Sequence, residues 1–167
     1  MQRRLVLLRH AEAAQGAVDA ERPLTDQGEE QAAAIGRWLQ QGDLVPDRVV
    51  VSPARRAART WELAAAQFTT PPTPLADGRI YDNTVDALLA LVHETPVDCE
   101  LVAVVGHNPS IGVLASILDD GEGNPAARKD LQTGFATGCV AVFSLETPFD
   151  SIAPGTATLT DFTVPRA

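Results

Sequence analysis

The sequence predicts an α/β fold around a largely parallel sheet, because three short apolar segments are placed like buried strands that lead into helices. Residues 5–8, 49–51 and 101–105 are runs of Leu, Val and Ala, the pattern of strands covered on both faces. The second run is followed by a Ser-Pro pair and the third by Gly-His-Asn-Pro. Ser, Asn and Pro are favoured where helices begin. This repeated order of strand, cap and helix indicates an α/β protein.

Four helices are predicted from the spacing of apolar side chains. The first begins after Thr25, which we expect to act as its N-cap, and ends near Gly42. The second covers about residues 53–68 and the third about residues 83–93. The fourth follows Asn108, with apolar residues at helical spacing.

The rest of the chain is predicted to contain a long loop and three further strands. Residues 119–138 are rich in Gly, and we expect a loop interrupted by at most a short helical piece. Residues 140–145 and 158–164 alternate well enough to be strands, and residues 72–76 are a candidate edge strand.

Length and composition indicate one globular domain covering residues 1–167. The chain is 45% hydrophobic and 21% charged, which is ordinary for a folded protein and excludes a disordered chain. Its formal net charge is −9, so long-range electrostatics would repel nucleic acids and anionic membranes. We therefore expect neither of these as a partner.

Cysteine usage and hydropathy predict a cytoplasmic protein. Cys99 and Cys139 lack the spacing of a zinc or redox motif, and we expect two buried thiols. The apolar run at residues 5–8 is too short for the core of a signal peptide, and no other segment approaches the length of a membrane span.

Basic side chains and imidazoles follow the predicted parallel strands. The first strand ends in Arg9 and His10, the second leads to Arg55 and Arg56, and the third is followed by His107. Ligand sites of open α/β sheets form outside the carboxyl ends of the strands. If the three strands are neighbours, two imidazoles and at least two guanidinium groups meet in one crevice. Such a crevice is a phosphate pocket by charge and geometry.

These segments resemble motifs of the histidine phosphatase superfamily, also called the phosphoglycerate-mutase-like family. In chain order, the matching segments are residues 7–12 (LLRHAE), 22–28 (RPLTDQG), 52–60 (SPARRAART) and 105–109 (VGHNP). In the family's register the phosphate-binding arginine falls on Arg56, whereas Arg55 and Arg59 fall on variable positions. The short chain and the Arg-Pro-Leu-Thr form are most similar to the small phosphohistidine phosphatases of the SixA type.

The resemblance implies a three-layer α/β/α sandwich around a mixed, mostly parallel sheet, and a phosphatase that needs no metal or other cofactor. In such an enzyme His10 attacks phosphorus and is transiently phosphorylated, while Arg9, Arg56 and His107 hold the phosphoryl group. Arg22 falls either on a contact to the substrate phosphate or on a structural contact within its loop. These five residues are the predicted site.

The state of His10 can be anticipated from its predicted surroundings. The ring must be neutral to attack, and nearby guanidinium groups favour this by lowering the pKa of the imidazole. We expect the second ring nitrogen to donate to a carbonyl or a carboxylate, which would fix the tautomer.

The weak signal for a general acid favours phosphohistidine as the substrate. Mutases and many alkyl phosphatases of this superfamily protonate the leaving oxygen with a carboxylic acid from the segment between the second and third motifs. Here Asp82, after Tyr81, is the best candidate, without a match to the acid motif. A protonated imidazole leaves phosphorus more readily than an alkoxide, so a phosphohistidine phosphatase has less need of an acid. The expected partner is thus a phosphorylated protein; the alternatives are a phosphatase of small phosphorylated molecules and a non-catalytic phosphate-binding module.

Overall fold

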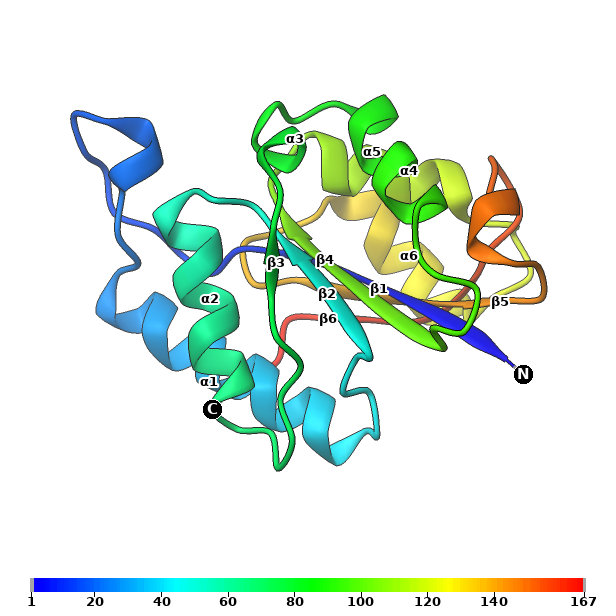
Figure 1. Ribbon diagram of the computed structural model, residues 1–167, viewed down its shortest axis with the longest axis horizontal. Coiled ribbons are helices and arrows are strands. Elements are labelled where there is room, and N and C mark those ends of the chain that lie inside the picture. The colour runs from blue at the N-terminus through cyan, green and yellow to red at the C-terminus, as the bar shows by residue number, and fades with distance from the viewer. Residues whose placement is uncertain (1, 167) are drawn as a thin grey trace.

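The computed structural model describes residues 2–166 and places one six-stranded sheet between two layers of helices (Figure 1). The spatial order of the strands is β3-β2-β4-β1-β5-β6. The first four are parallel to one another, whereas β5 pairs antiparallel with both β1 and β6. Their bounds are β1 (Arg3–Arg9), β2 (Arg48–Val51), β3 (Leu75–Ala76), β4 (Leu101–Gly106), β5 (Val140–Leu145) and β6 (Thr158–Thr163). The predicted mixed, mostly parallel sheet is confirmed.

Helices cover both faces of this sheet, as Figure 1 shows. The helices are α1 (Asp26–Gln41), α2 (Arg55–Ala65), α3 (Gly78–Tyr81), α4 (Val85–His93), α5 (Ser110–Leu118) and α6 (Pro125–Thr133), with 3-10 turns η1 (Asp19–Glu21) and η2 (Phe149–Ser151). The first two lie on one face and the other four on the opposite face. This arrangement confirms the expected three-layer sandwich.

The central strand β1 shows how both faces of the sheet are buried. Leu5 and Leu7 belong to the core cluster beneath α4, α5 and α6, whereas Val6 and Leu8 belong to the cluster beneath α1 and α2. All four side chains are fully buried. Side chains of a strand alternate between its two faces, so a continuous apolar run suits a strand covered on both sides.

Caps explain where the helices begin. Thr25 accepts a hydrogen bond from the amide of Gly28, which confirms its role as the N-cap of α1. The third predicted helix starts later than expected, at Val85, because Thr84 is its cap and Asn83 adopts a left-handed conformation with φ 63°.

The second predicted helix is shorter than residues 53–68, and its predicted start at Pro53 is wrong. It begins at Arg55, and the Ser52 hydroxyl, expected to cap it, accepts from the amide of Ala54 and contacts His107 instead. The serine therefore serves the site rather than the helix start.

The prediction for residues 119–138 underestimated the helical content. A nine-residue helix, α6, lies within this segment. Its signals are present in the sequence: Asn124 accepts from the amide of Ala127, Pro125 takes the first helical position, and Ala127 and Leu131 are buried one turn apart. Glycines on either side of the helix obscured them. The four-residue helix α3, capped by Asp77, was also missed.

The remaining strands agree with the prediction in place more than in length. The strand at residues 140–145 is confirmed, and the last strand ends at Thr163. The candidate edge strand at residues 72–76 is reduced to β3, since Pro72 and Pro74 have no amide hydrogen to donate to a neighbouring strand.

Two structural features relate to the predicted cytoplasmic location: the state of the cysteines and the character of the helices. Cys99 and Cys139 are free and buried, as predicted. Among the helices of residues 2–166, none combines the length and the apolar character needed to cross a bilayer. The cytoplasmic location stays a prediction.

Helices α1 and α2 pack closely at Gly36. A Cβ atom added to Gly36 would lie 2.1 Å from the carbonyl oxygen of Ala64 and 2.7 Å from its Cα. These are backbone atoms, so the clash can be relieved only if the two helices separate.

We predict that Gly36→Ala lowers the free energy of unfolding by about 1–3 kcal/mol through overpacking. Helix propensity alone would raise that free energy by about 1 kcal/mol, so the two effects have opposite signs. Urea denaturation measures the difference. Gly78→Ala is the matched control, since a Cβ there meets nothing within 4 Å. A Gly36→Ala protein as stable as the original would contradict the close packing.

Candidate active site

The parallel pairing of β1 with β4 brings two histidines together. In this pairing Arg9 lies opposite Gly106. The residues that follow the two strands, His10 and His107, are therefore side by side at the same edge of the sheet. The ring centroids are 5.3 Å apart, with an interplanar angle of 55°. Both side chains are buried, and the amide of His10 donates to the Gly106 carbonyl over 3.1 Å.

These histidines open into a small cavity of about 250 Å³ at the carboxyl ends of the parallel strands. The lining residues are Arg9, His10, Glu12, Ala13, Arg22, Arg56, Asn83, His107, Asn108 and Thr137. The cavity therefore brings together all five residues of the predicted site. A larger groove of about 620 Å³ beside α2 is lined mainly by apolar side chains and contains no histidine.

The ring of His10 is held in one tautomer, as the sequence led us to expect. Its Nδ1 lies 2.7 Å from the carbonyl oxygen of Ala11. Since a carbonyl only accepts, Nδ1 carries the hydrogen and Nε2 keeps its lone pair. Two hydrogen bonds fix the backbone at His10 and Ala11. The amide of Ala11 donates to Thr60 Oγ1, and the amide of Gly138, at φ 74°, donates to the His10 carbonyl.

Burial keeps both imidazoles neutral. The pKa of His10 falls from 6.5 to about 3, mainly through loss of hydration, with smaller lowering effects of His107, Arg56 and Arg9 and an opposing effect of the Ala11 carbonyl. The pKa of His107 falls to about 4, again mainly through burial and then through Arg56. Guanidinium charges were expected to be the cause; they contribute, but burial is the larger effect.

The arginines are positioned by different elements. Arg9, at the end of β1, donates through Nη1 to the carbonyl of Phe135 over 3.0 Å. Arg56 is buried in the first turn of α2, and both of its terminal nitrogens contact Asp19. The neighbouring Arg55 is exposed, and Arg59 pairs with Glu29 and Glu62. The register that singled out Arg56 therefore agrees with its position in the cavity.

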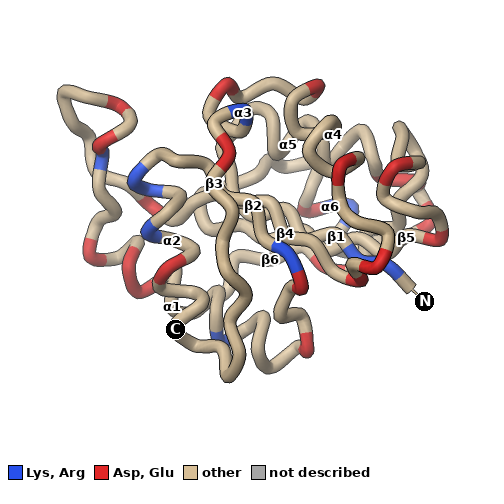
Figure 2. Tube along the Cα trace, viewed as in Figure 1, with Lys and Arg blue, Asp and Glu red and all other residues tan. Residues whose placement is uncertain are grey.

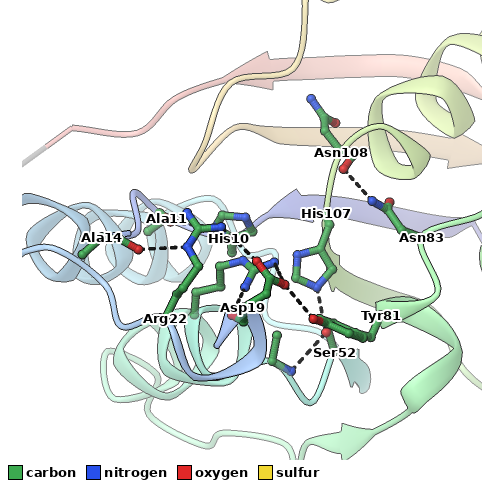
Figure 3. A network of polar contacts seen from close by, with 12 residues as sticks. His10, Ala11, Ala14, Asp19, Arg22, Ser52, Tyr81, Asn83, His107 and Asn108 are labelled. Atoms are coloured by element: carbon green, nitrogen blue, oxygen red, sulfur yellow. Dashed lines mark hydrogen bonds and ion pairs between the residues drawn. The ribbon is translucent and has the colours of Figure 1, made fainter. Parts of the chain in front are cut away.

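Arg22 makes the structural loop contacts that were one of its two predicted alternatives. Its Nε donates to the Ala14 carbonyl over 2.9 Å, and its Nη1 pairs with the Asp19 carboxylate over 3.2 Å (Figure 3). It also lines the cavity, so a contact to a bound phosphate remains a prediction.

Three buried nitrogens of the cavity residues have no hydrogen-bond partner within residues 2–166: Arg9 Nε, Arg56 Nε and His107 Nδ1. Burial, and to a smaller extent the charge of Arg56, also lower the pKa of Arg9 below its usual range. A buried donor without an acceptor is unfavourable by about 1–3 kcal/mol. The cavity lining thus combines permanently charged guanidinium groups with two imidazoles, which suits an anion.

The charge distribution agrees with an anion site. Although the chain has a net charge of −9 and Figure 2 shows basic and acidic positions close together in the loop before α1 and around α2, the cavity lining contains three arginines, Arg9, Arg22 and Arg56, against one carboxylate, Glu12. Within residues 2–166, no group of three or more His, Cys, Asp or Glu side chains is arranged to hold a metal ion.

Three polar residues at the site, Asp19, Tyr81 and Asn83, were not predicted from the sequence. Tyr81 lies edge-on to His107, with ring centroids 5.8 Å apart, and its hydroxyl donates to Asp19 over 2.6 Å (Figure 3). Asn83 donates to the Asn108 carbonyl and accepts from Ser110. The left-handed φ of Asn83 was the one feature with a signal, since Asn is enriched in that conformation.

The candidate acid Asp82 is not brought into the cavity. It is exposed at the end of α3 and does not line the site, whereas the preceding residue, Tyr81, faces His107. Tyr81, and not the acid Asp82, is therefore the residue of this segment that lies at the site.

Comparison with known proteins agrees with this geometry. The profile of the histidine phosphatase superfamily (branch 1) matches residues 5–79. The chain is 32% identical to a provisionally named phosphohistidine phosphatase SixA from Nakamurella multipartitia, whose structure superposes with a TM-score of 0.86 and which covers 100% of this chain and 98% of its own. It is 29% identical over 149 residues to phosphohistidine phosphatase SixA of Escherichia coli, covering 84% of each chain.

A third relative has been solved with an anion. The protein histidine phosphatase SixA complexed with tungstate is 27% identical, with a TM-score of 0.78 and 97% of each chain covered. The motifs, the sheet order, the paired histidines and these relatives agree, and the chain is a phosphatase that belongs to the SixA-type branch of the histidine phosphatase superfamily.

Proposed function

We propose that this protein hydrolyses phosphohistidine on a partner protein through a covalent phosphohistidine intermediate on His10, without a metal ion. The observation that carries the proposal is the set of unpartnered buried donors around a neutral imidazole. Arg9, Arg56 and His107 supply the donors, and His10 supplies a ring nitrogen with a free lone pair.

In the first step Nε2 of His10 attacks phosphorus. The substrate's imidazole takes a proton from solvent on its other ring nitrogen, the bond between phosphorus and its phosphorylated nitrogen breaks, and the ring leaves as neutral imidazole with the electron pair of that bond. Arg9, Arg56 and His107 hold the three equatorial oxygens, on which negative charge accumulates. In the second step water attacks phosphorus, the bond to Nε2 breaks, and inorganic phosphate and neutral His10 are released.

Ser52 prepares His107 to donate. The Ser52 oxygen accepts from the amide of Ala54, and it lies 2.8 Å from His107 Nε2. When the serine hydroxyl donates its hydrogen to Nε2, the hydrogen of the neutral imidazole is on Nδ1, the buried nitrogen without a partner. His107 can then donate to a phosphoryl oxygen while it remains uncharged.

The arginines take the place that a divalent cation has in many phosphoryl-transfer enzymes. Arg9 and Arg56 carry permanent charge and forked donors, which match the geometry of a phosphoryl group. Their charges also favour the neutral form of His10, so the same side chains serve the substrate and the nucleophile.

The surroundings of the cavity support a substrate that leaves without a strong acid. Asp82 lies outside the cavity. Glu12 Oε1 accepts from the Thr25 hydroxyl over 2.9 Å. Hydrogen bonds from Tyr81 and Arg22 lower the pKa of Asp19 to about 2, so it is ionised at neutral pH and has no proton to donate. A phosphoramidate bond to imidazole needs such a donor less than a phosphate ester does.

Substrate preference tests the proposal directly. We expect a phosphorylated histidine-containing phosphotransfer protein to be dephosphorylated with a kcat/KM at least about 10²-fold above that of sugar phosphates. The reason is that a sugar phosphate is an ester, and its leaving oxygen needs a proton that no acid of the site supplies. Release of inorganic phosphate measures both. Faster turnover of sugar phosphates would identify a phosphatase of small molecules, and phosphate binding without turnover of either would identify a binding module.

Arg56→Ala tests whether Arg56 holds the phosphoryl group during transfer. We predict a loss in kcat/KM on the order of 10²-fold or more, as for removal of one preorganised donor to the transition state. Arg55→Ala is the matched control, because it removes an exposed guanidinium from the same turn of α2. Steady-state kinetics on the same phosphoprotein gives both values. Equal losses in the two variants would argue against a specific role for Arg56.

A further inference from the structure

The carboxylate of Asp19 joins three segments at the edge of the cavity. It lies in η1, and its side chain is 53% exposed. Its Oδ2 accepts from Arg56 Nη2 over 3.2 Å and from the Tyr81 hydroxyl over 2.6 Å, while Oδ1 accepts from Arg22 Nη1 over 3.2 Å. Figure 3 shows this carboxylate between Arg22 and the phenol of Tyr81. One exposed residue thus connects the loop before α1 with α2 and α3.

These contacts define the position of the Arg56 guanidinium. In addition to the carboxylate contact at Nη2, its Nη1 donates to the main-chain carbonyl of Asp19 over 2.8 Å. Two contacts at the two ends of a planar group determine its orientation as well as its place. The remaining nitrogen, Nε, is buried without a partner within residues 2–166.

The fold itself does not explain why Asp19 makes so many contacts. The turn η1 contains no buried residue, so it contributes no side chain to either core cluster. All three side chains bound to the carboxylate also lie at the site: Arg22 and Arg56 line the cavity, and Tyr81 lies against His107. The contacts of Asp19 therefore act on the phosphate pocket.

We propose that Asp19 is a positioning residue for phosphoryl transfer: its carboxylate and carbonyl orient the Arg56 guanidinium, and the Tyr81 hydroxyl keeps the carboxylate in place. This inference rests on the role proposed above for Arg56. Asp19 does not touch the phosphoryl group, and it acts only through the arginine.

If Asp19 has this role, its replacement should reduce turnover without weakening the binding of inorganic phosphate. A negative charge beside the cavity repels a phosphate dianion, so its removal leaves the affinity for inorganic phosphate unchanged or raises it. Turnover depends on a preorganised guanidinium, and small errors in its position reduce the rate strongly. If Asp19 only maintained the structure of the loop, its replacement would reduce phosphate affinity and turnover together.

Asp19→Asn is the variant of choice, because it removes the charge, keeps the size and leaves the main-chain contact to Arg56 intact. We expect kcat to fall by on the order of 10-fold to 100-fold. The dissociation constant for inorganic phosphate, measured by calorimetry, should be unchanged or lower. Glu21→Gln is the matched control, because Glu21 is exposed in the same turn and does not line the cavity. It should change neither quantity.

Tyr81→Phe tests the second half of the proposal. It removes only the hydroxyl that donates to Asp19. We expect kcat to fall several-fold in the original protein and not to fall further in the Asp19→Asn background, because a residue that acts through Asp19 has no additional effect once the carboxylate is gone.

Two results would overturn the inference. One is a kcat for Asp19→Asn equal to that of Glu21→Gln. The other is a parallel loss of kcat and phosphate affinity with a lower unfolding temperature, which would show a structural role only. Comparison with Arg56→Ala separates this inference from the proposed function. A loss of activity in Arg56→Ala together with full activity in Asp19→Asn refutes only the role of Asp19, whereas full activity in Arg56→Ala refutes the role proposed for Arg56 itself.

Discussion

The site depends on the parallel register of β1 and β4. Because Arg9 lies opposite Gly106, two residues from distant parts of the sequence, His10 and His107, follow at the same edge of the sheet. The pairing of β2 with β4 then places the start of α2, and with it Arg56, beside them. A shift of one residue would reverse the faces of β1 and separate the two rings, so the two core clusters that bury β1 also maintain the geometry of the site.

Much of this arrangement could be predicted from sequence, because the buried strands are continuous apolar runs and the reactive residues follow them directly. Helix α6 was missed although its cap and buried pair were visible, since the flanking glycines indicated a loop. Asp19 and Tyr81 could not have been found in this way. Their roles come from contacts between segments distant in sequence, and an exposed aspartate in a short turn has no local signal.

Different groups of the site keep the nucleophile neutral and attract the anion. Burial makes the charged forms of both imidazoles unfavourable, which keeps a nucleophile available at neutral pH. The guanidinium groups remain charged and provide the attraction for an anion on a protein that is otherwise acidic. Asp19 balances part of that positive charge while it orients Arg56. The carboxylates near the cavity are thus hydrogen-bonded for positioning, in keeping with a leaving group that departs without a strong acid.

Trapping of the phosphoenzyme is the sharpest test of His10 as the nucleophile. The protein is mixed with a phosphorylated phosphotransfer protein, quenched in alkali within milliseconds and analysed by mass spectrometry. We expect an acid-labile phosphoryl group on His10, and its absence from His10→Ala, which should still bind inorganic phosphate but show no turnover. A phosphoryl group on another residue, or full activity in His10→Ala, would contradict this expectation.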